Sequence, residues 1–548
     1  MANEFHWTER IADVVEANVR QTKGEGATIV CQSGISPSGP IHLGNMREII
    51  SVHLVSEELR ARGWQVTHIH SWDDFDRLRK VPSNAPESMA EYKGKPLSDV
   101  PDPWGQFDSY ASRFISEFEQ AMDMLCIHPR YVRESVAYRS GIYNEQIDQA
   151  IQRRFDIFDI LAEYQSEDRA EKPADERRAE YYPFRVYCHS CGTDATRIIS
   201  YDRGAIDYSC GNCGNHASFN LDQEVPGKLV WKVDWPMRWS FEAVDFEPGG
   251  EDHSSPGGSL SVGRKIITKI FGGRPPYYVG YAFVLEGGSK ISSSEGTLAT
   301  PLAGLSIFEP AVLRWLYVRR NISQSLTIDF GNGARRTYDE WDAFVERIKK
   351  SAGSRVDQVV FDRSVKTSSC AVARTQVPVS FRLLSSSADI TQGNREQILR
   401  IVNQHLDGST VSEADLEPRL SCAIHWANEY QPEEEHTRIG NSFNETAYAG
   451  LSPETREGIR LLIEKLDDNW SLQGLTTLIY GIPKLLLGLA MDAQPNQALK
   501  DAQRSFFAAI YSLICDRDTG PRLPTLFLAI GRDRVRKLLT PPNMVAPL

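Results

Sequence analysis

The sequence predicts a mixed α/β protein in which an insertion splits a parallel-sheet domain and a helical region follows. Three observations predict this fold. A strand, a helix and a second strand follow one another in residues 28–70. Four closely paired cysteines interrupt the pattern at residues 184–220, and helical stripes replace strand signals from about residue 340. At about 150 residues per domain, a chain of 548 residues is expected to form three to four domains.

The first half of the sheet domain is predicted at residues 1–106. Residues 28–31 are an apolar strand, and a break rich in proline and glycine follows. An apolar stripe from Met46 to Leu59 then has helical spacing, and residues 66–70 alternate as a second strand. This order favours a parallel, Rossmann-like sheet with both faces covered. Ligands bind such sheets at the carboxyl ends of the strands.

An insertion is predicted at residues 107–227, and its last part carries two Cys-x-x-Cys pairs separated by residues 192–209. This spacing is typical of a zinc site with four thiolate ligands. Four thiolates complete the tetrahedron and leave no position for water, so we expect a structural Zn²⁺. Its expected ligands are Cys188, Cys191, Cys210 and Cys213. Weaker alternative ligands are His189 and His216, and the alternative to a metal is disulfides or free thiols.

The other five cysteines are scattered, a pattern that favours free thiols in a reducing compartment over a disulfide framework. They are Cys31, Cys126, Cys370, Cys422 and Cys515. The amino-terminal segment carries acids early and lacks the apolar core of a secretory signal. The most apolar stretch, residues 482–491, is about half the length of a membrane span and contains Lys484. We therefore expect a cytoplasmic protein that does not span a membrane.

The second half of the sheet domain is predicted at residues 228–300. Residues 229–234 have strand character, a glycine-rich loop follows at 249–259, and residues 277–285 are again strand-like. A segment that contacts a partner or links the domains is expected at residues 301–340. The rest of the chain, residues 341–548, is expected to be a helical domain, with apolar stripes at 459–466, 475–489 and 506–514.

The charge of the chain limits its partners. There are 61 Lys and Arg against 73 Asp and Glu, a net charge of −12. So acidic a chain is not expected to coat nucleic acid indiscriminately, and a nucleic-acid partner must meet a local basic surface.

The loop from Gly34 to Asn45 has the chemistry of a phosphate site. It leaves a strand, turns on small residues and opens a helix with His-Leu-Gly-Asn. The N-terminus of a helix presents free N–H groups and partial positive charge to phosphates. Gly44 leaves bare backbone for a flat base, and His42 and Asn45 are placed to donate hydrogen bonds to phosphates and sugar. Taken alone, these residues are more typical of an ordinary loop with a chance histidine.

Two further loops have complementary chemistry. Lys290-Ile-Ser-Ser-Ser follows two glycines, and lysine can neutralise charge that develops on phosphate oxygens while a hinged loop closes over them. Gly250-Glu-Asp252-His253 offers a carboxylate that can accept hydrogen bonds from ribose hydroxyls. Taken alone, each is more typical of a polar surface loop.

Together and in this order, the three loops resemble those of the class I aminoacyl-tRNA synthetases. His42-Leu-Gly-Asn45 is similar to the His-Ile-Gly-His element of that family, and Lys290-Ile-Ser-Ser-Ser294 is similar to its Lys-Met-Ser-Lys-Ser loop. Gly250-Glu-Asp252 stands where the family keeps a ribose-binding Gly-x-Asp. The segments that resemble the lysyl branch in particular are residues 71–82, 231–239 and 520–523.

The chain departs from the family pattern at two positions. Asn45 replaces the second histidine of the first element, and Ser293 replaces the second lysine of the loop around Lys290. Fewer cations are then left to neutralise charge in the transition state, so we expect Lys290 to carry most of that task in its loop.

The resemblance implies a lysine–tRNA ligase, which activates lysine with ATP and Mg²⁺ to lysyl-adenylate and transfers it to the terminal ribose of tRNA(Lys). The implied catalytic residues are His42, Asn45 and Lys290. The implied ATP-binding residues are Pro37, Gly39, His42, Gly44, Asn45, Gly250, Asp252, Lys290, Ser292 and Ser293. The implied lysine-binding positions are Gly34, Ser36, Trp231 and His253.

The ammonium group of lysine needs a carboxylate partner when it is buried. The acids near predicted strand ends are Asp73, Asp74, Asp76, Asp245 and Glu247. The sequence does not choose among them, and Asp73 is taken as the candidate. Aromatic walls are offered by Trp231, Trp235 and Trp239, although each tryptophan is individually more typical of a core.

The helical region resembles the anticodon-binding domain of the same family. A basic run at Arg532, Arg534, Arg536 and Lys537, with Arg522 nearby, offers partners for phosphates, and a solvated helix face explains the same charges. We expect tRNA as the nucleic-acid partner, with its stem in contact with the segment at residues 301–340, and neither DNA nor a membrane. The alternatives are a class I synthetase for glutamate or arginine, a relative that only makes an adenylate, and a zinc-ribbon RNA-binding protein without enzymatic activity.

Overall fold

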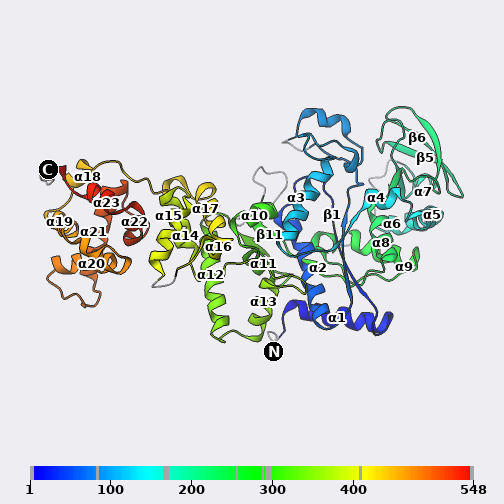
Figure 1. The fold of residues 1–548 in the computed structure, drawn as a ribbon. Helices are drawn as coiled ribbons and strands as arrows, with labels where there is room; N and C mark the ends of the chain where they lie inside the picture. The colour runs from blue at the N-terminus through cyan, green and yellow to red at the C-terminus, as the bar shows by residue number, and fades with distance from the viewer. Residues whose placement is uncertain are drawn as a thin grey trace. The chain divides into compact units, whose positions relative to one another are not determined.

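The computed structural model describes residues 5–81, 85–164, 172–254, 257–286, 289–290, 299–406 and 410–542. Its contacts divide the chain into two compact units, and Figure 1 colours the ribbon by residue number. The first unit consists of Met1–Leu305, Pro310–Ile328 and Arg347–Ala373. The second unit consists of Ser306–Glu309, Asp329–Glu346 and Arg374–Leu548.

A parallel sheet forms the centre of the first unit, in the order β1-β2-β3. Its strands are β1 (Ile29–Ile35), β2 (Val66–Trp72) and β3 (Arg130–Arg133). The register of β1 on β2 runs from Ile29 opposite Val66 to Ile35 opposite Trp72. Helix α2 (Leu43–Ala61) connects these strands, so the predicted strand–helix–strand unit and its parallel, Rossmann-like sheet are confirmed.

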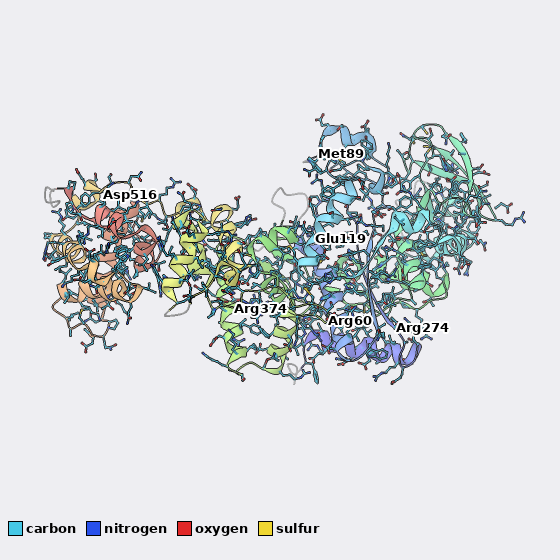
Figure 2. All side chains as sticks on the ribbon, in the orientation of Figure 1. Arg60, Met89, Glu119, Arg274, Arg374 and Asp516 are labelled. Carbon is cyan, nitrogen blue, oxygen red and sulfur yellow. A yellow bond between two sulfur atoms is a disulfide. The ribbon has the colours of Figure 1, made fainter. Side chains whose placement is uncertain are left out.

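The second half of the domain continues the same sheet. Phe246 forms parallel bridges to Cys31 in β1 and to Tyr277. Residues far apart in the sequence are therefore neighbours on one sheet. The helices of the first unit before the insertion are α1 (Trp7–Thr22) and α3 (Tyr110–Met124), with two 3₁₀ turns, η1 (Glu87–Tyr92) and η2 (Leu97–Asp99). Side chains from α3 reach the sheet, since Glu119, labelled in Figure 2, accepts a hydrogen bond from Trp72 Nε1 at 2.8 Å.

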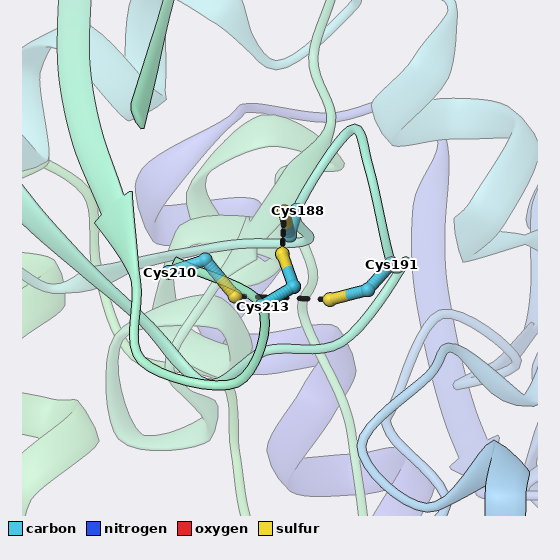
Figure 3. Close-up of side chains that lie close together, drawn as sticks. All are labelled: Cys188, Cys191, Cys210 and Cys213. Carbon is cyan, nitrogen blue, oxygen red and sulfur yellow. Dashed lines mark hydrogen bonds between the residues drawn. The ribbon is translucent and has the colours of Figure 1, made fainter. Parts of the chain in front are cut away.

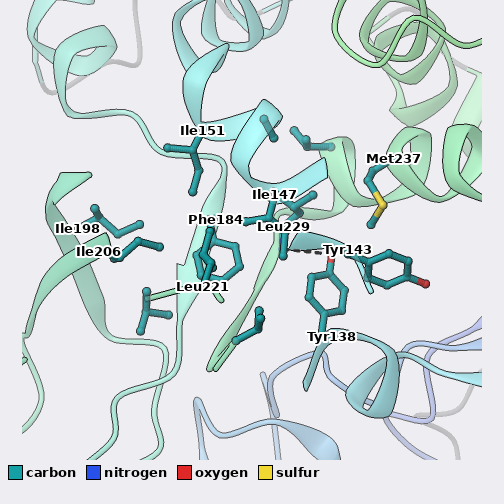
Figure 4. Packing of buried hydrophobic residues seen from close by; sticks show 14 of the residues in the cluster. Tyr138, Tyr143, Ile147, Ile151, Phe184, Ile198, Ile206, Leu221, Leu229 and Met237 are labelled. Carbon is teal, nitrogen blue, oxygen red and sulfur yellow. Dashed lines mark hydrogen bonds between the residues drawn. The ribbon is translucent and has the colours of Figure 1, made fainter. Parts of the chain in front are cut away.

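Between the two halves lie short helices and a cysteine-rich module. The helices are α4 (Glu134–Arg139), α5 (Asn144–Gln152), α6 (Arg154–Ala162) and α7 (Ala174–Glu180). The antiparallel strands are β4 (Phe184–Val186), β5 (Thr196–Asp202), β6 (Ala205–Cys210), β7 (His216–Asn220) and β8 (Gly227–Leu229). Figure 4 shows their shared core, in which Ile147 and Phe184 pack with Ile206 and Leu229. This core anchors the module to the rest of the first unit.

The strand expected at residues 229–234 is wrong beyond Leu229, because helix α8 (Trp231–Phe241) begins at Trp231. Trp231, Trp235 and Trp239 recur every fourth residue, which places them on one helical face. Their rings pack in sequence, with centroids 5.3 Å and 4.5 Å apart. Aromatic stacking at this spacing favours the helix over the strand.

The remaining elements of the first unit complete the sheet region. They are β9 (Gly249–Gly250), η4 (Glu251–Ser254), α9 (Ser259–Lys269), β10 (Gly280–Tyr281), β11 (Val284–Glu286), β12 (Ser289–Lys290), α11 (Pro310–Val318), β13 (Leu326–Ile328) and α13 (Arg355–Val365). Two helices cross the boundary between the units, α10 (Pro301–Ile307) and α12 (Asn332–Lys349).

From Arg374 onward, the described residues form helices and connecting loops. The helices are α14 (Phe381–Thr391), α15 (Arg395–His405), α16 (Glu413–Leu416), α17 (Arg419–Glu429), η5 (Glu433–Glu435), α18 (Glu445–Ala449), α19 (Pro453–Lys465), η6 (Asp467–Asn469), α20 (Leu472–Leu486), α21 (Gln497–Cys515), α22 (Leu523–Ile530) and α23 (Arg532–Leu539). The three predicted apolar stripes lie in α19, α20 and α21, and their apolar faces form one core. Across the described residues, every helix falls short of the length and apolar character that a membrane span requires.

Two of the scattered cysteines do not behave as the sequence predicts. Cys126, just after α3, and Cys370, after α13, form a disulfide with Cα atoms 6.1 Å apart. Cys31, Cys422 and Cys515 form no disulfide within the described residues, as expected, and all three are buried. The two paired cysteines are separated by 244 residues, so only the tertiary fold brings them together.

Candidate active site

The loop between β1 and α2 ends in a capping box. His42 is the N-cap of α2, and its Nδ1 accepts a hydrogen bond from the Asn45 backbone N–H at 3.3 Å. The Asn45 side chain accepts one from the His42 N–H, also at 3.3 Å. A Cβ atom on Gly44 would lie 2.7 Å from Nδ1 and Cε1 of the imidazole, so only glycine leaves room for this ring. The predicted residues His42, Gly44 and Asn45 therefore form one interlocked unit at the helix N-terminus.

The rest of this loop contacts helix α3. Pro37 is buried, whereas Ser36 and Gly39 are half-buried. Tyr110 in α3 donates a hydrogen bond from its hydroxyl to the Ser38 carbonyl at 3.3 Å. The loop is thus held at the carboxyl end of β1, where a parallel sheet binds its ligands.

Glu48, one turn beyond Asn45, is a site residue that the sequence reasoning missed. Its carboxylate accepts hydrogen bonds from the Gly34 N–H at 2.7 Å and from the Tyr281 hydroxyl at 2.8 Å. Burial raises the pKa of Glu48 to about 8, and the charges of Glu247 and Asp73 act in the same direction. Among the described residues, Glu48 has no cationic side chain within ion-pair distance. An acid inside the apolar stripe from Met46 to Leu59 was the signal that could have identified it.

Glu247 is a second buried carboxylate held by neutral donors. It accepts hydrogen bonds from the indole N–H of Trp235 at 3.0 Å and from that of Trp239. Burial raises its pKa to about 7. Trp231, on the same face of α8, donates from its indole N–H to Ser259 Oγ at 3.1 Å. The tryptophans therefore position an acid and also build an aromatic wall beside the sheet.

Asp73 belongs to a buried ionic network. Its Oδ1 lies 3.0 Å from Nη1 of Arg238, which also lies 3.1 Å from Glu134 Oε1. Lys228 and Arg238 both approach Asp234, at 3.6 Å and 3.2 Å. Burial raises the pKa of Asp73 to about 6 and that of Glu134 to about 7. The site region therefore holds more buried carboxyl groups than cations.

The other acids considered from the sequence already have partners. Asp74 accepts hydrogen bonds from the backbone and hydroxyl of Ser135. Asp76 pairs with Lys228 at 2.8 Å, and Asp245 pairs with Lys23 at 2.7 Å. Each of these three carboxylates has a structural role in the first unit.

The glycine loop and the lysine loop are described in part. Gly250 in β9 is buried opposite Tyr281 in β10. The backbone of Asp252 and His253 lies in η4, and their side chains lie outside the described residues. Lys290 lies in β12, opposite Leu285, and its side chain also lies outside them. The predicted residues Ser292 and Ser293 fall in the segment 291–298, which lies outside the described residues.

The four expected zinc ligands lie together in the cysteine-rich module (Figure 3). One sulfur atom of each lies within 4.8 Å of all the others. The Sγ atoms of Cys188 and Cys213 are 3.7 Å apart, and so are those of Cys191 and Cys210. Tetrahedral Zn–S bonds of about 2.3 Å require sulfur atoms about 3.8 Å apart, so the four side chains fit a zinc ion. Both ring nitrogens of the alternative ligand His189 have partners, Tyr208 and Glu224.

Comparison with known proteins identifies this arrangement. The family model for class I (K) tRNA synthetases matches residues 5–368. The chain belongs to this family. It is therefore a class I aminoacyl-tRNA ligase, and the family uses ATP. The synthetase is 41% identical to the lysine–tRNA ligase of Streptomyces coelicolor, over 97% of this chain and 98% of that protein. It is 32% identical to the lysine–tRNA ligases of Pyrococcus horikoshii and Borreliella burgdorferi, over 97% of this chain and 98–99% of theirs.

The structure brings several predicted residues of this synthetase to one end of the sheet. The contacts of Glu48 join Gly34 at the end of β1 to Tyr281 in β10. Electrostatic coupling to Glu48 places Asp73 and Glu247 in the same region. In the basic run of α23, Arg536 already has an acidic partner, since it pairs with Asp467 at 2.8 Å.

Proposed function

We propose that this class I synthetase is a lysine–tRNA ligase. The observation that carries this proposal is a group of buried carboxylates at the end of the sheet, with Glu48 held by hydrogen-bond donors and lacking a cation among the described residues. Such a site favours a substrate with a positively charged side chain, because an ammonium supplies the missing charge. The likeness to lysine–tRNA ligases over nearly the whole chain supports the same conclusion.

Glu48 is proposed to bind the side-chain ammonium of lysine, with the Tyr281 hydroxyl as its neighbour. Asp73, the sequence-based candidate, already pairs with Arg238, so its negative charge would act on the pocket from a distance. Glu247 would add to the negative potential. Trp231, Ser36 and His253 are proposed to surround the lysine stem and its amino acid head, beside the backbone of Gly34.

The ATP site is proposed at the N-terminus of α2. Pro37, Gly39 and Gly44 would leave space for the adenosine, while His42 and Asn45 would contact phosphates and sugar. Gly250 and Asp252 would bind the ribose. Lys290, with Ser292 and Ser293, would cover the triphosphate from the opposite side, together with Mg²⁺.

The reaction asks the protein for position and charge neutralisation. The lysine carboxylate would attack the α-phosphate of ATP, forming lysyl-adenylate and releasing pyrophosphate. A hydroxyl of the terminal ribose of tRNA would then attack the lysyl carbonyl and release AMP. Lys290 would stabilise the negative charge that leaves with pyrophosphate, so its cation matters most in the first step.

The domain limits predicted from the sequence are retained as part of this proposal. Residues 1–106 and 228–300 would form the catalytic domain, and 107–227 the insertion with its structural Zn²⁺ at the four cysteines. Residues 301–340 would link it to an anticodon-binding domain at 341–548, which would bind tRNA(Lys).

Arginine and glutamate are the competing amino acids. The excess of buried carboxylates opposes glutamate by charge repulsion, whereas arginine shares the charge of lysine. Amino-acid-dependent ATP–pyrophosphate exchange, measured with tRNA present, separates the three. We expect exchange with lysine and at most trace exchange with arginine or glutamate at equal concentration. Exchange that prefers arginine or glutamate would overturn the assignment to lysine.

A further inference from the structure

We propose that a cavity at the amino ends of the sheet strands binds a small carboxylate with an apolar body, and that Trp239 transmits its occupancy to the amino acid site. The cavity has a volume of about 560 Å³, which lies within the range of sites that hold one small ligand. All of its lining residues belong to the first unit. This ligand site goes beyond the proposed function, which uses the opposite ends of the strands.

Hydrogen bonds of the sheet fix the end of the strands at which the cavity lies. Asp245 and Tyr277 line the cavity, and Phe246, the residue after Asp245, bridges both β1 and Tyr277 in parallel. The Val30 N–H donates to the Asp245 carboxylate at 2.8 Å, and the Asp245 N–H donates to the Val30 carbonyl at 2.8 Å. Because Val30 lies at the start of β1 and Gly34 lies near its end, the cavity and the proposed lysine site are at opposite ends of this strand.

The cavity has an apolar floor and a polar rim. Its floor includes the buried side chains of Trp239 and Val244, beside the half-buried Tyr277. Its rim includes Lys23, the C-cap of α1, and Arg274 from the loop after α9, which is labelled in Figure 2. A lining of this kind suits a ligand that buries an apolar body and keeps a polar head near the surface.

The rim carries one positive charge that no carboxylate compensates. The charged side chains that line the cavity are Lys23, Asp245 and Arg274, so two cations face one carboxylate. Lys23 pairs with Asp245 at 2.7 Å, and these two charges offset each other. Arg274 is exposed and has no ion pair with another described residue. A guanidinium donates two parallel hydrogen bonds to a carboxylate, so a ligand with a carboxylate head complements this rim.

Trp239 connects the cavity to the amino acid site. It lines the cavity, and its indole N–H donates to the buried carboxylate of Glu247, which interacts electrostatically with Glu48. The ring is tightly packed, since a Cβ atom on Gly263 in α9 would lie 3.0 Å from its Cζ3. Because a close-packed interior has little free space to absorb a displacement, a ligand that moves this ring would also move the Glu247 carboxylate.

Calorimetric titration of the full-length protein tests the binding site. The probes are 2-naphthoate, an aromatic carboxylate, and naphthalene-2-methanol, its neutral counterpart. We expect a site for 2-naphthoate with a dissociation constant of about 1 mM or tighter. Arg274→Gln should raise this constant by about five- to ten-fold and leave binding of the neutral probe unchanged. The control is Arg203→Gln, which removes the same charge from a 92% exposed side chain between β5 and β6.

A second variant fills the cavity and leaves its charge unchanged. Asn18 lines the cavity from an exposed position in α1, so Asn18→Trp is expected to place an indole in the opening without disturbing the core. This variant should lose binding of both probes. The control is Ala17→Trp, at an exposed position of the same helix that does not line the cavity, and it should bind both probes as the wild type does.

The role of Trp239 is tested by ATP–pyrophosphate exchange, with whichever amino acid the synthetase activates. Saturating 2-naphthoate should change the KM for that amino acid by about five-fold or more, the lower end of typical couplings between two sites. Arg274→Gln should need about five- to ten-fold more 2-naphthoate for the same effect. Trp239→Phe keeps an aromatic ring but removes the donor to Glu247, so 2-naphthoate should still bind while most of its effect on KM is lost.

Two results would overturn this proposal. One is binding of 2-naphthoate that is absent, or that is the same in Arg274→Gln and Asn18→Trp as in their controls, in variants whose thermal unfolding matches the wild type. The other is binding that leaves the KM for the amino acid unchanged, which would overturn the role of Trp239. Binding is measured without an amino acid, and exchange uses the amino acid that the enzyme prefers. Failure of the lysine assignment is therefore distinguishable from failure of this proposal.

Discussion

The backbone N–H of Leu43, the first residue of α2, donates a hydrogen bond to the Ala299 carbonyl at 2.8 Å. Ala299 directly follows residues 291–298, and Lys290 precedes them in β12. The Tyr317 hydroxyl donates to the Leu43 carbonyl at 2.8 Å and holds the same point from another helix. The segment that carries the predicted lysine loop therefore returns to the N-terminus of α2, beside His42. This connection is the structural basis for proposing one ATP site from two distant parts of the sequence.

Lys290→Ala is expected to lower lysine-dependent ATP–pyrophosphate exchange by about 10²–10³-fold, the usual effect of removing one group that stabilises transition-state charge. Lys269→Ala, an exposed lysine in α9, is the control and should retain exchange. Both are assayed with saturating tRNA. Near-normal exchange by Lys290→Ala would remove Lys290 from the catalytic residues.

Gly44→Ala is expected to lower kcat/KM for ATP by about 10²-fold, because displacing a catalytic group by about 1 Å has effects of this size. The added Cβ would lie 2.7 Å from the His42 ring and force it to move. The free energy of unfolding should change little, because the better helix preference of alanine, about 0.5–1 kcal/mol, offsets the cost of moving the ring. Gly450→Ala, at the end of α18 in the second unit, where the nearest contact of the added Cβ is the Ala447 carbonyl oxygen at 3.5 Å, is the control. Steady-state kinetics with unchanged ATP dependence would contradict the role of Gly44.

Glu48→Gln is expected to raise the KM for lysine by about 30-fold or more, because losing one partner of a buried charge pair costs about 2–5 kcal/mol. Tyr281→Phe removes one hydrogen bond and should have a smaller effect. If Glu48→Gln leaves the KM for lysine unchanged, another carboxylate binds the ammonium.

The raised pKa of Glu48 predicts a pH dependence. In the folded protein the pKa is about 8, against 4.5 for the ordinary group. Between these values the folded state holds a proton that the unfolded chain has released, so the free energy of unfolding falls as pH rises through this range. Lysine binding requires the carboxylate, so lysine affinity should increase from pH 6 to pH 8. Calorimetric titration tests this dependence, which Glu48→Gln should flatten. An affinity that is constant or decreases over this range would contradict it.

The cysteine cluster predicts one zinc ion per chain. Cys191→Ser should lose the metal and lower Tm by at least about 2–4 °C, the shift that 1 kcal/mol produces in a domain of 150–250 residues. Cys422→Ser, at a buried cysteine of the second unit outside the cluster, should keep its zinc. Metal analysis and thermal unfolding check both variants. Substoichiometric zinc in the wild type, with equal Tm in Cys191→Ser, would contradict a structural metal.

Local patterns were enough to predict the centre of the fold. The apolar run at residues 28–31 and the stripe from Met46 to Leu59 are properties of neighbouring residues, and they predicted β1 and α2. The strand predicted at residues 229–234 was wrong because alternating apolar residues also occur in a helix whose aromatic face repeats every fourth residue. Trp231 and Trp235 in α8 form such a face. Periodicity over so few residues does not separate the two structures.

Long-range contacts were beyond the sequence. The disulfide of Cys126 with Cys370 joins residues that only the completed fold brings together. The choice of the acid that binds the lysine ammonium had the same limit. Asp73 is disfavoured because it pairs with Arg238, and Glu48 is favoured because its partners are the Gly34 N–H and the Tyr281 hydroxyl. Partners of this kind depend on the packing of distant segments and leave little trace in the local pattern.

The central claim is that the N-terminus of α2 and the loop around Lys290 bind one ATP molecule beside a lysine held by Glu48. A crystal structure with lysine and a non-hydrolysable ATP analogue tests it most directly. The account predicts His42 and Lys290 in contact with the same triphosphate, at hydrogen-bond distances of about 2.7–3.2 Å, and the lysine ammonium at a similar distance from Glu48. Phosphates bound away from His42, with Lys290 in a separate cleft, would contradict it.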